Sequence, residues 1–294
     1  MCAVDSTGIR VDWTSVDFVT DCGLLRRLYQ WVNSSSTSKE FRLDLQLVGQ
    51  RTILLACSHG DGKRRSASTD EIHSFGRNFE RATTSAPVGG NRDDNYIRIL
   101  RYNLGGLNMI VQSEVDACLQ SLPGQNKTIK MPSENSKGVD TGAVSSSKPI
   151  PGGKLHKQPD YLPVRVIPGG TRLSQDNLVE LKTTVSSRSS SDVKSKAWPQ
   201  LFFSQSAHLI TGVHKDGFFS KIRHDRVTHD VSSRSGRIRG LVSALRLIQE
   251  TAVSRGTKGL ELGLIFQSAR LLCIYRREGG GLLPKAMIER IWRR

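Results

Sequence analysis

Residues 178–183 read Leu-Val-Glu-Leu-Lys-Thr, a short apolar stretch that carries two charges at alternate positions. Because side chains of a strand alternate between its two faces, Val179 and Leu181 point one way and Glu180 and Lys182 the other. A charged face on a core-like strand costs free energy unless something neutralises the charge. The stretch therefore predicts either a strand that carries a functional site or the solvated face of a half-exposed strand.

A second pair of acids, Glu114 and Asp116, stands two residues apart in a strand predicted over 108–118. The same alternation places both carboxylates on one side. Carboxylates from separate strands can meet at one point, and oxygen ligands of this kind suit Mg²⁺ or Mn²⁺. Such an ion polarises a phosphoryl oxygen and lowers the pKa of a bound water, while a nearby lysine stabilises the developing charge. The two acidic segments together favour phosphate hydrolysis.

The composition favours a polyanionic partner. The chain has 294 residues, a net charge of +16 and a pI near 10.0. This balance indicates binding to nucleic acid or to an acidic membrane surface, with a merely basic soluble protein as the alternative. No apolar run is long enough to span a membrane. The five cysteines are scattered and never spaced as CxxC, which favours reduced thiols and argues against a zinc site.

The chain divides into three zones by its patterning. Residues 1–119 and 164–294 are expected to form two halves of one domain, and 120–163, rich in Ser, Gly, Pro and Lys, a disordered insertion. Helical periodicity or a capping box predicts helices near 24–31, 69–81, 198–207 and 241–252. Alternating or short apolar runs predict strands near 41–47, 52–57, 96–102, 108–118, 178–184, 208–214, 218–222, 260–265 and 271–275. The mixture predicts an α/β or α+β domain whose central sheet is flanked by helices.

An acidic residue, a long gap and then Glu-x-Lys resemble the signature of the PD-(D/E)XK nucleases. Longer segments resemble, in order, motifs of the DXO family of decapping nucleases, most closely its diverged fungal branch. Residues 75–80 are similar to that family's Gly-Tyr-x-Phe-Glu helix, 113–117 to its Gly-Glu-Val-Asp motif and 179–183 to its Glu-Leu-Lys-Thr motif. Residues 16–25 and the pair 198–200 and 209–212 resemble two further segments. Together the segments are far more specific than any one alone.

The resemblance implies a PD-(D/E)XK-like mixed sheet, a Mg²⁺ or Mn²⁺ cofactor and RNA 5′ ends as substrate. Carried over by position, Lys182 and Gln200 would hold the attacking water or the scissile phosphate. The expected metal ligands are Glu80, Asp116 and Glu180 directly, the carbonyl of Leu181, and Glu114 through a metal-bound water.

One position departs from the family's pattern. Cys22 stands where the first motif usually carries an arginine, just before the glycine that Gly23 matches. That arginine is thought to hold RNA phosphates or the cap, so its loss bears on substrate affinity and choice more than on metal binding. Arg26 and Arg27, one helical turn further along, are the candidates to compensate.

Three functions are open from the sequence. The leading hypothesis is a metal-dependent RNA 5′-end hydrolase of mRNA quality control, which removes caps, pyrophosphate or NAD, with 5′→3′ exoribonuclease activity as an extension. The second is a catalytically weak partner that stabilises a nuclear 5′→3′ exoribonuclease. The third is a PD-(D/E)XK DNA nuclease. The expected location is the nucleus, the cytoplasm or both, with no membrane partner.

Overall fold

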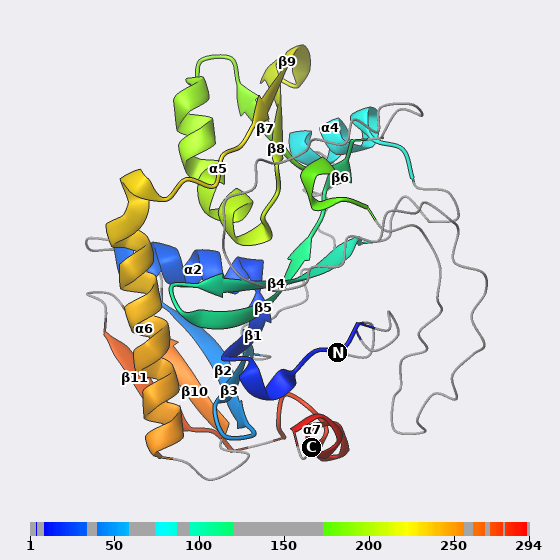
Figure 1. The fold of residues 1–294 in the computed structure, drawn as a ribbon. Coiled ribbons are helices and arrows are strands. Elements are labelled where there is room, and N and C mark those ends of the chain that lie inside the picture. The colour runs from blue at the N-terminus through cyan, green and yellow to red at the C-terminus, as the bar shows by residue number, and fades with distance from the viewer. Residues whose placement is uncertain are drawn as a thin grey trace, which may run out of the picture.

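The computed structural model describes residues 4, 9–33, 40–58, 74–86, 95–119, 173–255, 261–267, 271–278 and 280–292. These residues form two β-sheets, which lie one above the other in Figure 1 with helices packed against them. The predicted insertion over 120–163 lies outside the described residues, so its character and the boundaries at 119 and 164 stay predictions. No described helix combines the length and the apolar composition that crossing a membrane requires.

The larger sheet has seven strands in the order β11-β10-β2-β3-β1-β5-β4. β1 runs parallel to both β3 and β5, and the other neighbouring pairs are antiparallel, so the sheet is mixed as predicted. Its strands are β1 (Phe18–Asp21), β2 (Phe41–Val48), β3 (Thr52–Cys57), β4 (Ile97–Leu104), β5 (Leu107–Glu114), β10 (Glu261–Phe266) and β11 (Leu272–Arg276).

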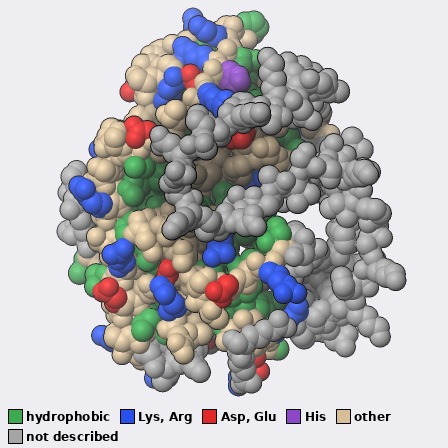
Figure 2. Space-filling model, viewed as in Figure 1, with side chains coloured by type: hydrophobic (Ala, Val, Ile, Leu, Met, Phe, Trp, Pro, Cys, Tyr) green, Lys and Arg blue, Asp and Glu red, His purple; other side chains and the backbone are tan. Residues whose placement is uncertain are grey.

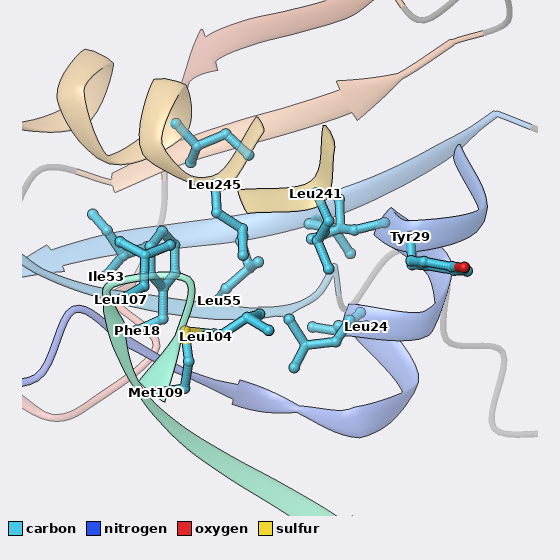
Figure 3. Close-up of a cluster of buried hydrophobic side chains, with 14 of the residues drawn as sticks. Phe18, Leu24, Tyr29, Ile53, Leu55, Leu104, Leu107, Met109, Leu241 and Leu245 are labelled. Atoms are coloured by element: carbon cyan, nitrogen blue, oxygen red, sulfur yellow. The ribbon is translucent and has the colours of Figure 1, made fainter. Parts of the chain in front are cut away.

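The main core lies between this sheet and two helices, α2 (Cys22–Asn33) and α6 (Ser235–Ser254). Leu245 of α6 points toward Leu55 and Leu104 of the sheet and Leu241 toward Leu24 of α2 (Figure 3), and all of these side chains are buried. Burying one such side chain stabilises the fold by about 2 kcal/mol. A short 3-10 turn, η1 (Trp13–Ser15), and α7 (Lys285–Trp292) form a second, smaller apolar cluster with the sheet.

The smaller sheet has four strands in the order β6-β7-β8-β9. They are β6 (Ala117–Cys118), β7 (Leu178–Val185), β8 (His208–Lys215) and β9 (Phe218–Arg226). The helix α5 (Ser190–Ser204) connects the parallel strands β7 and β8, and β8 turns into β9 through Asp216 and Gly217, both at positive φ. The helix α4 (Phe75–Thr83) packs on β7, and two 3-10 turns, η2 (Gln175–Asn177) and η3 (Ser232–Arg234), complete the described elements.

The mixed α/β fold with a helix-flanked sheet is confirmed, and several local predictions need correction. The helix predicted over 198–207 spans Ser190–Ser204. The strand predicted over 108–118 ends at Glu114, and the chain resumes as β6 in the other sheet. The helix predicted from Thr69 begins instead at Phe75, because Ser74 is extended and its hydroxyl oxygen accepts a hydrogen bond from the Arg77 N–H at 3.5 Å.

Candidate functional site

β7 brings Glu180 and Lys182 to one face of the smaller sheet, as the alternation predicts. Glu180 is buried, with 2% of its surface exposed, which rules out a solvated strand face for this residue. The Lys182 ammonium donates a hydrogen bond to Glu180 Oε1 and lies 3.2 Å from the Leu181 carbonyl oxygen. One positive charge therefore already meets two of the oxygens that are expected to bind the metal.

Asp116 lies where the chain crosses from the larger sheet to the smaller one. Its Oδ2 accepts a hydrogen bond from the Leu181 N–H at 2.8 Å, which holds the carboxylate against the strand that carries Glu180. Burial first, and then the negative charge of Asp116, raises the pKa of Glu180 to about 7, although Lys182 acts in the opposite direction. Two carboxylates from distant parts of the chain therefore compete for positive charge at this point.

Glu80 approaches Asp116 and Glu114 from α4, a helix that packs on the face of the smaller sheet opposite to the one carrying Glu180. The ring of Phe79 fixes this helix on the sheet: a Cβ added at Gly212 would lie 2.5 Å from it, so only glycine permits the approach. Partial loss of solvent, followed by the charges of Asp116 and Glu114, raises the pKa of Glu80. Glu114 and Asp116 thus lie near enough to Glu80 to act on its pKa, although a continuous strand does not carry them.

The N-terminus of α2 forms another wall of the site. Asp21 Oδ1 accepts a hydrogen bond from the Leu24 N–H at 2.9 Å, and the Cys22 thiol donates to the Gln200 carbonyl at 3.7 Å. Burial raises the pKa of Cys22 to about 12, with Arg26 opposing and Glu180 reinforcing the rise. Cys22 is therefore a neutral thiol beside the acidic cluster, and it supplies no positive charge to a phosphate.

The structure separates the two arginines that were candidates to replace the missing one. Arg26 is close enough to Cys22 to affect its pKa, whereas the Arg27 guanidinium lies 4.6 Å from the centre of the Phe41 ring, over the main core. Of the two, Arg26 is the one whose charge acts on Cys22.

The donor set suits a divalent cation, but the side chains do not close around one as they lie. Carboxylates and a backbone carbonyl are the hard oxygen donors that Mg²⁺ and Mn²⁺ prefer. Within the described ranges, no three His, Cys, Asp or Glu side chains come close enough together to hold a metal ion. The Glu180 carboxylate is hydrogen-bonded to the Lys182 ammonium, and the Asp116 carboxylate to the Leu181 N–H. Metal binding therefore requires the ion to replace the Lys182 ammonium at Glu180.

Two residues near the site were missed from the sequence. Thr184 continues the alternation of Glu180 and Lys182, and its buried hydroxyl has no hydrogen-bond partner, so strand periodicity alone could have found it. Arg223 lies in the same cross-strand row as Lys182 and Thr211, and its buried Nη1 also lacks a hydrogen-bond partner. That row depends on the register of three strands, which local sequence does not encode.

Residues 2–266 match a family described as a domain of unknown function, DUF8563. No curated protein matches the sequence. Among solved structures, S. pombe Rai1 in complex with 3′-FADP aligns with a TM-score of 0.60 and 16% identity over 94% of this chain and 76% of that one.

Two other solved structures have the same fold at lower similarity. Candida albicans Rai1 in complex with pU5 and Mn²⁺ aligns with a TM-score of 0.55 and 14% identity over 98% and 75% of the two chains. K. lactis Dxo1 in complex with manganese aligns with a TM-score of 0.53 and 8% identity over 93% and 68%. At these identities the likeness establishes the fold, and on that level the resemblance to the DXO-type nucleases is confirmed.

Proposed function

The chain belongs to the DUF8563 family, and we propose that it is a divalent-metal-dependent hydrolase acting on RNA 5′ ends. One observation carries the proposal: the buried Glu180 carboxylate and the Leu181 carbonyl meet on a single cation, the Lys182 ammonium, with Asp116 held alongside. Buried acids without sufficient partners are costly, and a cation that joins them removes that cost. The fold is the one in which Rai1 and Dxo1 have been solved with nucleotide ligands or manganese.

The ion would be held by Glu80, Asp116, Glu180 and the Leu181 carbonyl, with Glu114 acting through water. When bound, it supplies charge stabilisation at the phosphate and an acidified water. Lys182, displaced from Glu180, is then available to donate hydrogen bonds to a phosphate oxygen. Gln200, on α5 beside Cys22, is the candidate to orient the attacking water.

The net charge of +16 supports a nucleic-acid substrate, since phosphate neutralisation by Lys and Arg supplies most non-specific affinity. The proposed reactions are removal of a cap, pyrophosphate or NAD from the RNA 5′ end. A further proposed activity is 5′→3′ degradation of the RNA. Mg²⁺ or Mn²⁺ is the proposed cofactor, and the nucleus, the cytoplasm or both the proposed location.

The test is a panel of RNAs that share one sequence and differ at the 5′ end: triphosphate, NAD, unmethylated cap and monophosphate, each with Mn²⁺. Wild type should release a product from at least one of them. Glu180→Ala should abolish turnover, and Glu250→Ala, on the exposed side of α6, should leave it unchanged. If wild type leaves every end intact, the proposal is wrong. A DNA oligonucleotide cleaved in preference to RNA would favour a DNA nuclease instead.

One observation supports a second candidate function, that of a partner protein of an exoribonuclease with little activity of its own. The thiol of Cys22 is neutral and buried where the resembling family carries an arginine. A panel in which metal binds but no 5′ end is hydrolysed would favour this role.

A further inference from the structure

The smaller sheet ends in a β8–β9 hairpin whose tip carries a strongly exposed ring. Phe218 opens β9 with 77% of its surface exposed, the highest value among the exposed large apolar side chains of the described residues. A single exposed apolar residue is common on protein surfaces and calls for no function by itself. The residues that share its face distinguish this one.

Strand register places three cations on the same face as Phe218. Thr211, Val213 and Lys215 alternate along β8, and their partners on β9 are Arg223, Lys221 and Phe218; a register shift between Val213 and His214 gives β9 one extra residue between Lys221 and Phe218. Directly paired residues of neighbouring strands share a face, so Lys215, Phe218, Lys221 and Arg223 form one surface, which we call the hairpin-tip patch.

The hairpin-tip patch has a net positive charge. Lys215 and Lys221 are exposed, and the buried Nη1 of Arg223 has no acceptor. Asp225, an acid further along this face, is paired with Lys194 at 2.7 Å, which leaves Asp216 of the turn beside the three cations of the patch. In Figure 2, Lys and Arg side chains gather at the top of the molecule, where β9 lies in Figure 1.

The same face leads to the candidate site. Lys182 pairs with Thr211 and Thr211 with Arg223, so Glu180 and Lys182 lie on the face that carries the patch. α5 covers this face at the row of Glu180, where Ala197 and Leu201 pack on Leu209, the partner of Glu180. Thr211, Val213 and Thr184, between that row and the tip, are also buried, so the face is exposed at the hairpin tip. From the row of Lys182 to that of Phe218 is four residues, or about 13 Å along the strands. That is the length of about four nucleotides at the ~3.4 Å spacing of a stacked strand.

We propose that the hairpin-tip patch binds single-stranded RNA downstream of the 5′ end, with a base stacked on Phe218 and phosphates on the exposed Lys215 and Lys221. Exposed aromatic rings beside a basic track are the means by which proteins hold single strands without reading their sequence. This inference rests on the proposed function for the polarity of the RNA, but the binding itself does not require hydrolysis.

The test measures fluorescence anisotropy of labelled single-stranded RNAs in EDTA, so that no metal-dependent cleavage contributes. One RNA has about ten nucleotides, long enough to span both regions, and the other about two. For the longer RNA, Phe218→Ala and Phe218→Leu should each weaken binding roughly 5- to 30-fold, which corresponds to ~1–2 kcal/mol for one lost stacking contact. Phe218→Trp should bind as wild type does, and the short RNA should be unaffected by all three changes.

Tyr275→Ala is the matched control, since Tyr275 is an aromatic side chain with 55% of its surface exposed on β11, in the other sheet. Unchanged binding by Phe218→Ala, equal losses in Tyr275→Ala, or equal losses for the short RNA would overturn the proposal. So would full binding by Phe218→Leu, which would indicate apolar docking of a protein instead. A wild-type protein that binds no RNA would overturn it too. If binding depends on Phe218 but no 5′ end is hydrolysed, the patch stands and the proposed function fails.

Discussion

Asp17 beside the seven-stranded sheet and Glu180 in the four-stranded sheet are both buried carboxylates, and their surroundings have opposite effects. Asp17 accepts hydrogen bonds from the Asn108 N–H at 2.8 Å and the Gln249 amide at 3.0 Å, and it pairs with Arg51. Burial alone would raise its pKa, but these partners together lower it. Glu180 has Lys182 as its partner and Asp116 as a neighbouring acid, and its pKa is raised.

The opposite pKa shifts distinguish an acid that stabilises the fold, Asp17, from one suited to binding a ligand, Glu180. Asp17 joins the start of β1 to β5, to the β2–β3 turn and to α6, so its charge is fully used in holding these elements together. Glu180 is left with more negative charge around it than its partner neutralises. Buried acids with excess negative charge around them cluster at functional sites, because a bound ligand supplies the positive charge that the protein lacks there.

The largest expected effect lies in the core of the seven-stranded sheet. Phe266 is fully buried, stacked at 4.6 Å on Phe41 and edge-on at 4.9 Å to Trp31. Phe266→Ala should lower the free energy of unfolding by about 3–5 kcal/mol, because the lost contacts leave a cavity. Urea denaturation measures this, and a loss below about 1 kcal/mol would contradict the packing described here.

The same acid-to-amide change should act in opposite ways on the two carboxylates. Asp17→Asn should cost about 1.5–3 kcal/mol, since its partners then face a neutral group. Glu180→Gln should cost nothing or stabilise the metal-free protein, because it removes a charge from an acidic cluster. Thermal unfolding of both variants in EDTA compares them directly, and destabilisation of both to the same extent would remove the distinction.

The two arginines of α2 allow a finer comparison. Arg26→Ala should lower the turnover of an RNA 5′ end roughly tenfold, the value of one charge-assisted contact of ~1.4 kcal/mol. Arg27→Ala should not, because that guanidinium lies over Phe41. Steady-state kinetics on one RNA decide the matter, and a larger loss for Arg27→Ala would reverse the assignment.

The smallest expected effect is the acid dependence of Asp17. Because its pKa is lowered on folding, its contribution to stability is complete above its ordinary value of 3.8 and is lost as the pH falls from there through the folded pKa. Denaturation of wild type and Asp17→Asn at pH values above and below this range should show the difference between them shrinking in acid. A constant difference would mean that Asp17 is not the group that titrates.

Much of the fold, and the shared face of Glu180 and Lys182 in the candidate site, followed from local pattern. Alternation placed Glu180 and Lys182 on one face, and the strands predicted near 96–102 and 108–118 pair as β4 and β5, joined by a turn through Gly105 and Gly106. Alternation failed at Asp116, because the crossing between two sheets ends the strand at Glu114, and sheet membership depends on distant partners.

Other parts of the site were beyond the reach of pattern alone. Glu80 came only from the family resemblance, since a glutamate in a polar helix carries no signal of its own. Tertiary packing decides which of Arg26 and Arg27 lies near Cys22, and strand register decides where Arg223 lies. A single sequence fixes neither.

The central claim is that Glu180 belongs to a divalent-cation site, and titration calorimetry with Mn²⁺ tests it most directly. Wild type should bind Mn²⁺ with measurable heat, Glu180→Gln should bind at least roughly tenfold more weakly, and Glu250→Gln should match wild type. No heat from wild type, or equal affinity in Glu180→Gln, would contradict the claim.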